Sequence, residues 1–399
     1  MDMLSRLLQP TLRRLATENP VVTLTGPRQS GKTTLLRATF PKHAYATLED
    51  PDVRQFATTD PRGFLDQFAG SVVLDEIQRT PDLFSYIQAA VDRDDTPGRF
   101  VLSGSQNFLL LRGVAQSLAG RTAICHLLPF SLSELVARKP FKSSQVGRKL
   151  PKTRVVANSL IEVMHRGFYP RIHDKGLEPQ RWLRDYYQTY VQRDVRDVIN
   201  VGDLETFHRF VRLCAGRNGQ LLNLSSLGND CGVTHTTAKR WLSVLEASFI
   251  VFLLRPHHRN FNKRLTKSPK LYFLDTGLLC YLLQIRDAEL LRHHSSRGAV
   301  FESFVISELL KSAWHTGDEP HLYFWRDSTG HEVDVIIDEG ESQVPVEIKS
   351  SQTIASDFFA NLHYWRKLAG DADGPAALVY GGNESYRREG VACYSWQVF

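Results

Sequence analysis

The stretch LTGPRQSGKTT, residues 24–34, constrains the fold of this chain more than any other part of the sequence. It contains a complete G-x-x-x-x-G-K-[ST] motif and follows a short β-branched run, residues 21–24, that predicts a buried strand. Gly26 and Gly31 let the backbone approach a phosphate group closely, and the N–H groups of the loop then point at its oxygens. The helix predicted after the loop, residues 33–38, adds the positive end of its dipole. The sequence therefore predicts a phosphate-binding loop between a strand and a helix.

Two side chains of this loop have a defined chemistry. Lys32 adds a positive charge near the β- and γ-phosphates of a nucleotide, and the Thr33 hydroxyl is placed to bind Mg²⁺. Arg28 is a weaker candidate for contacts with the phosphates. The predicted nucleotide-binding residues are Gly26, Pro27, Arg28, Gln29, Ser30, Gly31, Lys32, Thr33 and Thr34.

A second apolar run, residues 71–74, ends in the carboxylates Asp75 and Glu76. Beside a phosphate-binding loop, Asp75 is expected to hold the Mg²⁺ shell and Glu76 to polarise the attacking water; a solvated turn is the alternative interpretation. The guanine-reading motif N-K-x-D is absent from the sequence, and the similar NKRL at 262–265 lacks the acid. The pattern therefore favours ATP and its hydrolysis.

Two further residues are candidates for contacts with the γ-phosphate. Ser105 follows the predicted strand 99–102, where P-loop ATPases commonly carry a polar sensor residue; Gln106 is the second choice, and a capped turn is the alternative. Arg121 is expected either to act as an arginine finger, in cis or from a neighbouring subunit, or to form a surface salt bridge. A role in trans would require a homo-oligomer.

Length and composition set the frame for these motifs. The chain has 399 residues, and because single cores stop growing near ~250–300 residues, two or three domains are expected. The net charge of +6 mildly favours an anionic partner. The five cysteines form no C-x-x-C pair, which fits a reducing cytoplasm, and no apolar run reaches the ~18 residues of a membrane span.

The order of the predicted strands, with an extra strand at 43–48, predicts a parallel sheet flanked by helices in the first domain. A basic segment with two prolines, residues 138–154, then reads as a linker. We therefore expect a multidomain α/β protein with domains at residues 1–150, 155–285 and 290–399.

The middle domain is predicted to contain a winged helix–turn–helix. Gly232 is expected to make the turn and Thr234 to cap the second helix, which would bury Ala238, Leu242 and Leu245. Strands 249–254 and 271–274 flank a basic loop that would form the wing. Contact with protein or packing over the nucleotide is the alternative to DNA binding. The predicted nucleic-acid contacts are Lys239, Arg240, Arg259, Lys263, Arg264 and Lys267.

The C-terminal residues carry an E…D…E-x-K pattern. Glu347 and Lys349 are two apart on a predicted strand, so both face the same way, and Asp334 lies one hairpin earlier. The order helix, strand, strand, strand resembles the PD-(D/E)xK nuclease fold. The resemblance implies that Glu302, Asp334 and Glu347 bind a metal ion and that Lys349 orients or activates the nucleophile. A valine, Val333, replaces the usual proline, and a solvated sheet face with a salt bridge is the alternative.

A longer string of motifs gives a narrower resemblance. GPRQSGKTTLL, TLEDPDVRQFA, VVLDEIQ, LSGSQNFLL, SLAGR, LPFSLSEL, GFYPRI (167–172) and YYQTYVQRDVRDV (186–198) together resemble the AAA-like ATPases of prokaryotic genomes that carry a C-terminal domain of unknown function. This resemblance implies ATP binding and hydrolysis, and it covers nearly the whole chain. We expect a Mg²⁺-dependent ATPase that couples hydrolysis to DNA binding and, in one version, to DNA cleavage. The alternative is a nucleotide-dependent switch or scaffold whose nuclease-like module is silent.

Overall fold

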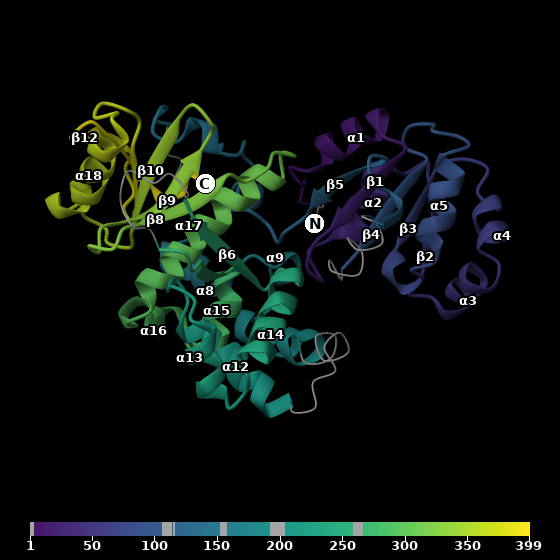
Figure 1. Ribbon diagram of the computed structural model, residues 1–399, viewed down its shortest axis with the longest axis horizontal. Helices are drawn as coiled ribbons and strands as arrows, with labels where there is room; N and C mark the ends of the chain where they lie inside the picture. The colour runs from purple at the N-terminus through teal and green to yellow at the C-terminus, as the bar shows by residue number, and fades with distance from the viewer. Residues whose placement is uncertain (1–3, 106–113, 115, 152–157, 192–203, 258–265) are drawn as a thin grey trace. The chain divides into compact units, whose positions relative to one another are not determined.

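The computed structural model describes residues 4–105, 114, 116–151, 158–191, 204–257 and 266–399. The chain divides into two compact units (Figure 1). The first unit holds residues 1–130 with the short segments 247–249 and 314–318, and the second holds the rest. The predicted middle and C-terminal domains therefore fall within one unit, and the boundaries near residues 150 and 285 stay predictions.

The first unit is built on a five-stranded sheet in the order β2-β3-β4-β1-β5, in which every pairing is parallel. This confirms the predicted parallel sheet. The strand β4 lies between β1 and β3, so the loop after β1 and the acids at the end of β3 meet at the same edge. The strands are β1 (Val21–Thr25), β2 (Ala44–Thr47), β3 (Val72–Asp75), β4 (Phe100–Gly104) and β5 (Thr122–His126).

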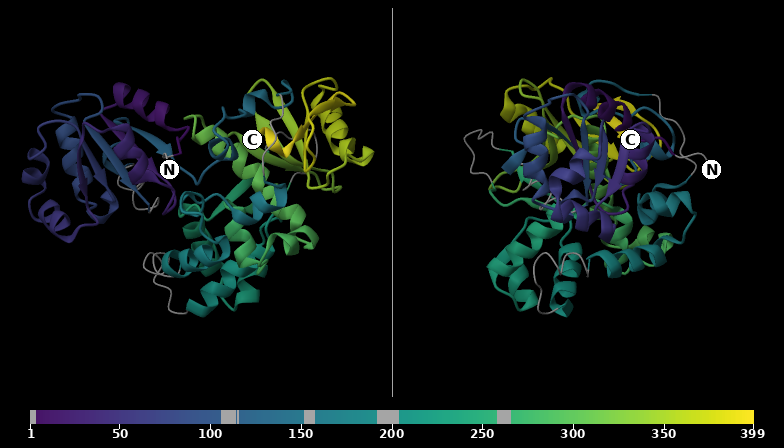
Figure 2. Two further views of the ribbon diagram at one scale, coloured as in Figure 1. Left: turned by 180° about the vertical axis from the view of Figure 1, so that it is seen from behind. Right: turned by 90° about the vertical axis from the view of Figure 1, so that its right-hand side faces the viewer.

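Helices cover both faces of this sheet, as Figure 2 shows from two further sides. Alternate residues of each strand point to opposite faces, so Val21 packs with α3–α5 while Val22 and Leu24 pack with α1 and α2. Strands β1, β3 and β4 are buried throughout, which explains their continuous apolar runs. The helices are α1 (Gln9–Glu18), α2 (Lys32–Thr39), α3 (Pro51–Thr59), α4 (Pro61–Asp66) and α5 (Leu83–Val91).

The second unit contains an eight-stranded sheet in the order β12-β13-β11-β10-β9-β8-β6-β7. Strand β9 is antiparallel to both β8 and β10, whereas β11 runs parallel to β10 and to β13. The hairpin of β6 and β7 joins the same sheet because β6 pairs with β8 in parallel. The strands are β6 (Val251–Pro256), β7 (Lys270–Phe273), β8 (Leu322–Arg326), β9 (Glu332–Asp338), β10 (Gln343–Lys349), β11 (Ala377–Tyr380), β12 (Tyr386–Arg388) and β13 (Val391–Ser395).

Helix α17 is the longest of the described helices of this unit and is buried over most of its length. A single π-helical turn, Tyr187–Val191, follows α10. The α-helices are α7 (Leu132–Leu135), α8 (Leu160–Arg166), α9 (Pro170–Asp174), α10 (Pro179–Tyr186), α12 (Leu204–Gly216), α13 (Leu224–Cys231), α14 (His235–Ala247), α15 (Thr276–Leu282), α16 (Ala288–His293), α17 (Arg297–Trp314) and α18 (Ala360–Ala369).

The GFYPRI motif has a structural role in the second unit. The buried carboxylate of Asp275 caps α15 through the N–H of Leu278, at 2.8 Å, and also accepts the N–H of Phe168, at 2.7 Å. Gly167 has φ +70°, and a Cβ there would lie 2.6 Å from Asp275 Oδ1. The motif therefore ties α8 to α15.

Two further features concern the helices and the cysteines of the described residues. None of their helices combines the length and the apolar character needed to cross a membrane. All five cysteines are buried and carry free thiols.

Candidate nucleotide site and carboxylate cluster

The loop after β1 closes tightly against the end of β5. Gly26 has φ +153°, and a Cβ at this position would lie 2.1 Å from the carbonyl oxygen of Leu127. Gly31, with φ +92°, is the N-cap residue of α2. Only glycine fits the close approach at Gly26 and adopts the left-handed conformation at Gly31 without strain, which explains both ends of the motif.

The side chain of Lys32 folds back over the loop. Its Nζ donates to the carbonyl oxygens of Gly26 and Pro27, both at 2.9 Å. Burial lowers the pKa of Lys32 to about 8, although the carboxylates of Glu76 and Asp75 act in the opposite direction. A triphosphate in the loop would supply the negative charge that this buried ammonium group needs.

Asp75 lies at the centre of a hydroxyl cluster at the end of β3. Its Oδ2 accepts hydrogen bonds from Thr33 Oγ1, at 2.6 Å, and from the hydroxyl of Tyr45, at 2.7 Å. Ser103 Oγ donates to the other carboxylate oxygen. The structure thus brings the two predicted Mg²⁺ ligands of this site into direct contact.

Glu76 is held in an uncommon conformation beside Asp75. Its φ of +56° is rare for a residue with a side chain and is typical of strained functional positions. Ser105 Oγ donates to Glu76 Oε2 at 3.1 Å, and Gln78 Nε2 donates to the same oxygen at 2.5 Å. The carboxylate is therefore oriented by two neighbours, one of which is the predicted sensor Ser105. The second-choice sensor, Gln106, lies outside the described residues.

Arg121 is not part of this constellation. It immediately precedes β5, and its carbonyl accepts the N–H of Val21 at the first residue of β1, whereas the loop follows the last residue of that strand. Its Nε is 2.5 Å from Asp92 Oδ1 in an exposed ion pair. Five residues of strand span roughly 16 Å, so a contact in cis with the γ-phosphate is ruled out in this conformation. Action in trans stays a prediction.

Sequence reasoning missed Arg6, whose guanidinium group lies against the loop. Its Nη1 donates to the carbonyl oxygen of Ser30 at 2.7 Å, and its Nη2 donates to that of Leu128 at 2.6 Å. In a trans peptide the carbonyl and the next N–H point in opposite directions, so this bond directs the N–H of Gly31 away from Arg6. Arg6 therefore fixes one of the amides expected to face phosphate. No sequence signal links it to a loop more than twenty residues away.

Replacing Arg6 by Ala is expected to weaken ATP binding roughly tenfold, because charge-assisted hydrogen bonds contribute about 1.5–3 kcal/mol and tenfold corresponds to about 1.4 kcal/mol. Isothermal titration calorimetry would measure the dissociation constant. Arg14→Ala is the matched control, since Arg14 forms only an exposed ion pair with Glu18 at 3.0 Å. An unchanged affinity in a folded Arg6→Ala protein would contradict the positioning role.

The second candidate site is the surface of α14. Thr234 Oγ1 accepts the N–H of Thr237 at 3.2 Å, and Gly232, two residues before Thr234 in the turn, has φ +74°. Ala238, Leu242 and Leu245 are buried, as predicted, while Lys239 and Arg240 are exposed. Lys267 is also exposed. Three other predicted contacts, Arg259, Lys263 and Arg264, lie outside the described residues.

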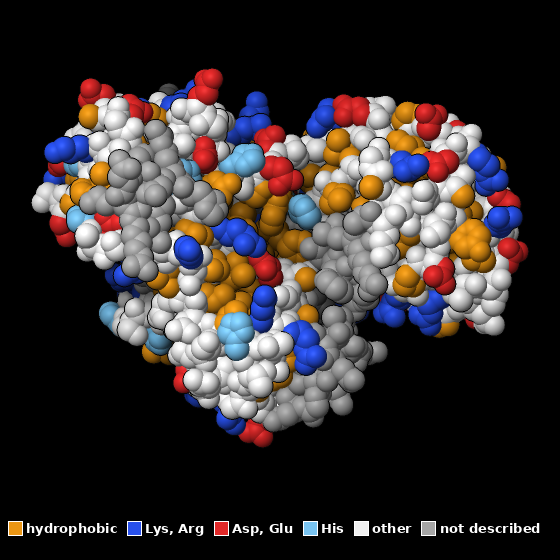
Figure 3. Space-filling view, viewed as in Figure 1, with side chains coloured by type: hydrophobic (Ala, Val, Ile, Leu, Met, Phe, Trp, Pro, Cys, Tyr) orange, Lys and Arg blue, Asp and Glu red, His pale blue; other side chains and the backbone are white. Residues whose placement is uncertain are grey.

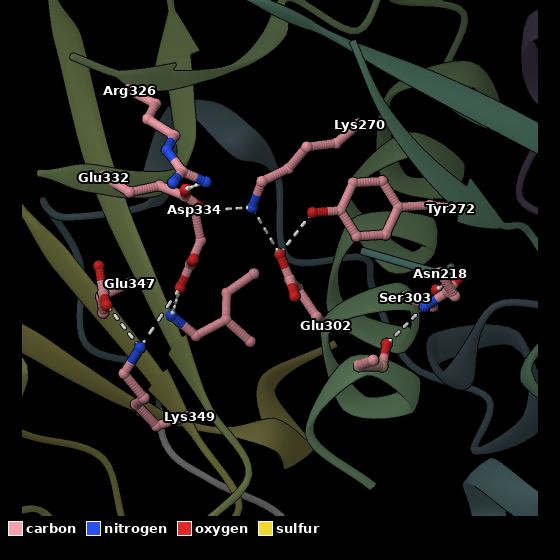
Figure 4. A network of polar contacts seen from close by, with 12 residues as sticks. Asn218, Lys270, Tyr272, Glu302, Ser303, Arg326, Glu332, Asp334, Glu347 and Lys349 are labelled. Atoms are coloured by element: carbon pink, nitrogen blue, oxygen red, sulfur yellow. Dashed lines mark hydrogen bonds and ion pairs between the residues drawn. The ribbon is translucent and has the colours of Figure 1, made fainter. Parts of the chain in front are cut away.

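The C-terminal pattern forms one polar network, which Figure 4 shows from close by. Pairing of β9 with β10, with Val335 opposite Val346, brings Asp334 beside Glu347 and Lys349. Lys349 Nζ lies 2.5 Å from Glu347 Oε1 and 3.7 Å from Asp334 Oδ2. The structure therefore places these three predicted residues together.

Glu302, the fourth predicted residue, has partners that the sequence did not indicate. Lys270 Nζ lies 3.4 Å from Glu302 Oε1, and the hydroxyl of Tyr272 donates to the same oxygen. Lys270 also forms a close ion pair with Glu332. Strand alternation puts Glu332 on the same face as Asp334, so the sequence could have predicted that Glu332 joins this network. No pattern predicts that Lys270, at the end of the basic run 255–270, joins it as well.

Burial dominates the electrostatics of the carboxylate cluster, defined as Glu302, Glu332, Asp334 and Glu347. It raises the pKa of Glu302 and of Glu347, and the charge of Asp334 adds to both shifts. Lys270 and Lys349 act in the opposite direction. In the described part of the chain, no three or more His, Cys, Asp and Glu side chains are grouped so that they could hold a metal ion.

Three family models match segments of the chain. Residues 18–136 match an AAA domain. Residues 157–289 match a domain of unknown function, DUF8612, and residues 297–399 match another, DUF4143. The first match agrees with the P-loop fold, and the third covers α17 and the sheet that carries Asp334 and Glu347.

Two relatives match most of the length of this chain. An uncharacterized protein of Mycobacterium tuberculosis, Rv2008c, is 31% identical over 345 residues, which are 86% of this chain and 73% of that protein. The protein MJ1544 of Methanocaldococcus jannaschii is 20% identical over 337 residues, 80% of this chain and 72% of its own length. Among solved structures, a Walker-type ATPase of Pyrococcus abyssi, PABY2304, has 15% identity and a TM-score of 0.46, covering 71% of this chain and 96% of that one.

Proposed function

Since the chain belongs to the family of Rv2008c of Mycobacterium tuberculosis and contains an AAA domain, we propose that it binds ATP with Mg²⁺ at the loop of residues 26–34 and hydrolyses it. One observation carries this proposal: three segments of the chain meet at the edge of the sheet to which the loop belongs. Thr33 of α2 contacts Asp75, and Ser105 after β4 contacts Glu76, the residue next to Asp75 at the end of β3.

The donor atoms of Thr33 and Asp75 fit Mg²⁺, because a hydroxyl and a carboxylate oxygen are ligands that it prefers and they lie 2.6 Å apart. Thr33 and Asp75 would hold the ion, which would supply positive charge next to the β- and γ-phosphates. Lys32 would turn from the loop carbonyls to the phosphates. Glu76 accepts a proton from the attacking water, and Ser105 and Gln78 orient its carboxylate.

We further propose that the second unit binds DNA through a winged helix. Helices α13 and α14 with the hairpin β6–β7 have the order of elements of that fold. Figure 3 shows Lys and Arg side chains at the surface near α14, and Lys239 and Arg240 are exposed there. In this proposal α14 enters the major groove, and the loop between β6 and β7 contacts phosphate.

The carboxylate cluster supports a nuclease-like role for the C-terminal module. The sheet order and the places of Glu302, Asp334, Glu347 and Lys349 fit the PD-(D/E)xK pattern. Glu347 Oε2 is buried and has no hydrogen-bond partner in the described part of the chain, which fits a ligand position facing a cation. A divalent ion there would activate water for phosphodiester hydrolysis.

A second candidate function is a nucleotide-dependent switch or scaffold with a silent C-terminal module. The observation that favours it is the pairing of the carboxylates with lysines, which leaves no group of three free ligands among the described residues. In both versions the protein acts in the cytoplasm, and Arg121 completes the site of a neighbour if it forms a homo-oligomer.

Measuring the ATPase rate and DNA affinity together tests this proposal. We expect DNA to change the rate, and the double variant Lys239→Ala/Arg240→Ala to weaken binding and lower the slope of log affinity against log salt by about two. Lys175→Ala, an exposed lysine on the same unit, is the control. An ATP hydrolysis rate that does not change with DNA, together with no salt-dependent DNA binding, would favour the nucleotide-dependent switch or scaffold.

A further inference from the structure

Lys270 is a buried lysine whose ammonium group lies inside the carboxylate cluster. It is the first residue of β7, and strand alternation places it on the same face as Tyr272, so that both side chains reach Glu302 of α17. Its ammonium group is 3.4 Å from Glu302 Oε1 and closer still to Glu332 Oε1. The side chain is only 4% exposed, so this charge faces carboxylates and not solvent.

The cluster has two halves with different balances of charge. Glu302 and Glu332 both form ion pairs with Lys270, and Glu332 Oε2 also forms an ion pair with Arg326 Nη1 at 3.1 Å. Two carboxylates therefore meet two cations in this half (Figure 4).

The other half has fewer cations in contact with its carboxylates. Among the described residues, Lys349 is the cation in ion-pair contact with Asp334 and Glu347, so two carboxylates meet one cation in this half, although the charge of Asp334 also acts on Lys270. Glu347 Oε2, buried and without a hydrogen-bond partner among the described residues, belongs to the same half. The surplus carboxylate and the unfilled acceptor thus coincide beside Asp334 and Glu347, where a bound cation would satisfy both.

We propose that Lys270 occupies one of two cation positions in this cluster, so that the C-terminal module binds a single divalent ion, through Asp334 and Glu347, and Glu302 is not a ligand. The proposal deepens the nuclease-like role proposed above and rests on it. Two carboxylates suffice for Mg²⁺, which usually keeps several waters and is held by one or two carboxylates. A phosphate group bound beside the ion would then be stabilised by two positive charges, the metal ion and the ammonium group of Lys270.

Binding of Mn²⁺ to the nucleotide-free full-length protein tests the stoichiometry, with free Mn²⁺ measured by electron paramagnetic resonance. We expect Glu347→Ala to lose one bound ion per chain relative to the wild type. Glu302→Gln keeps the side-chain shape and is expected to retain that ion. Glu341→Gln, in an exposed turn between β9 and β10, is the matched control. Lys270→Met is expected to gain a second ion, because Glu302 and Glu332 lose their cation.

Different results would contradict the assignment of Lys270 and the metal-binding role of the C-terminal module. Loss of the ion in Glu302→Gln, loss of two ions in Glu347→Ala, or no additional ion in a folded Lys270→Met protein would overturn the assignment of Lys270 while leaving a metal-dependent module in place. No difference in bound Mn²⁺ between wild type and Glu347→Ala would overturn both. The wild-type, Glu302→Gln and Glu347→Ala arms decide the question even if Lys270→Met does not fold.

Discussion

Replacement of Glu76 by Gln is expected to leave ATP binding intact and to slow ATP hydrolysis by at least about a hundredfold, within the range that a general base contributes. The amide has the size of the carboxylate and keeps an oxygen that accepts hydrogen bonds from Ser105 and Gln78. It is a far weaker base and does not accept the proton of the attacking water. Phosphate release measured alongside ATP titration separates turnover from binding.

Gln78→Ala serves as the comparison for Glu76→Gln, because it removes one hydrogen bond to the carboxylate and leaves its basicity. Its turnover is expected to fall much less. If Glu76→Gln hydrolyses ATP at the wild-type rate, Glu76 does not activate water, and the proposed catalytic role is wrong.

Replacement of Lys32 by Ala is expected to abolish measurable nucleotide binding, a loss of at least about a hundredfold, or roughly 3 kcal/mol. The ammonium group is buried inside the loop, so no solvent cation replaces it next to the phosphates, and truncation also frees the carbonyls of Gly26 and Pro27. Titration with a fluorescent ATP analogue would measure the affinity.

The matched control for Lys32→Ala is Lys42→Ala, which removes an exposed lysine shortly after α2. It is expected to bind nucleotide like the wild type. ATP binding by a folded Lys32→Ala protein with less than tenfold loss would contradict the assignment of the loop as the phosphate site.

The nucleotide site was largely predictable because its chemistry lies in contiguous residues. The loop contributes its glycines, Lys32 and Thr33 within one stretch, and the acids directly follow a second apolar run. For Arg121 the sequence left two interpretations open, an arginine finger and a surface salt bridge. Arg121 precedes β5, which runs parallel to β1, so it lies at the edge of the sheet away from the loop and pairs there with Asp92. A role in trans stays a prediction.

The carboxylate cluster was predictable where strand periodicity applies and unpredictable elsewhere. Glu347 and Lys349 share a face because they are two residues apart, and the hairpin brings Asp334 beside them. Lys270 and Arg6 carry no such pattern, since each reaches its site from an element distant in sequence. The basic run that contains Lys270 predicts a solvated loop, whereas the start of β7 buries that residue.

The pairing of β6 with both β7 and β8 has a consequence for how this protein can be divided. Arg255 lies opposite Tyr323 and Pro256 opposite Phe324, so one hydrogen-bonded ladder joins β6, which follows α14, to the C-terminal sheet. A cut between residues 289 and 297 would leave an open strand edge on each fragment, and such edges promote aggregation. The two regions match separate family models, yet gene fusions and truncations that keep only one of them would have to repair an exposed edge. Evolution is therefore expected to transfer them as a pair.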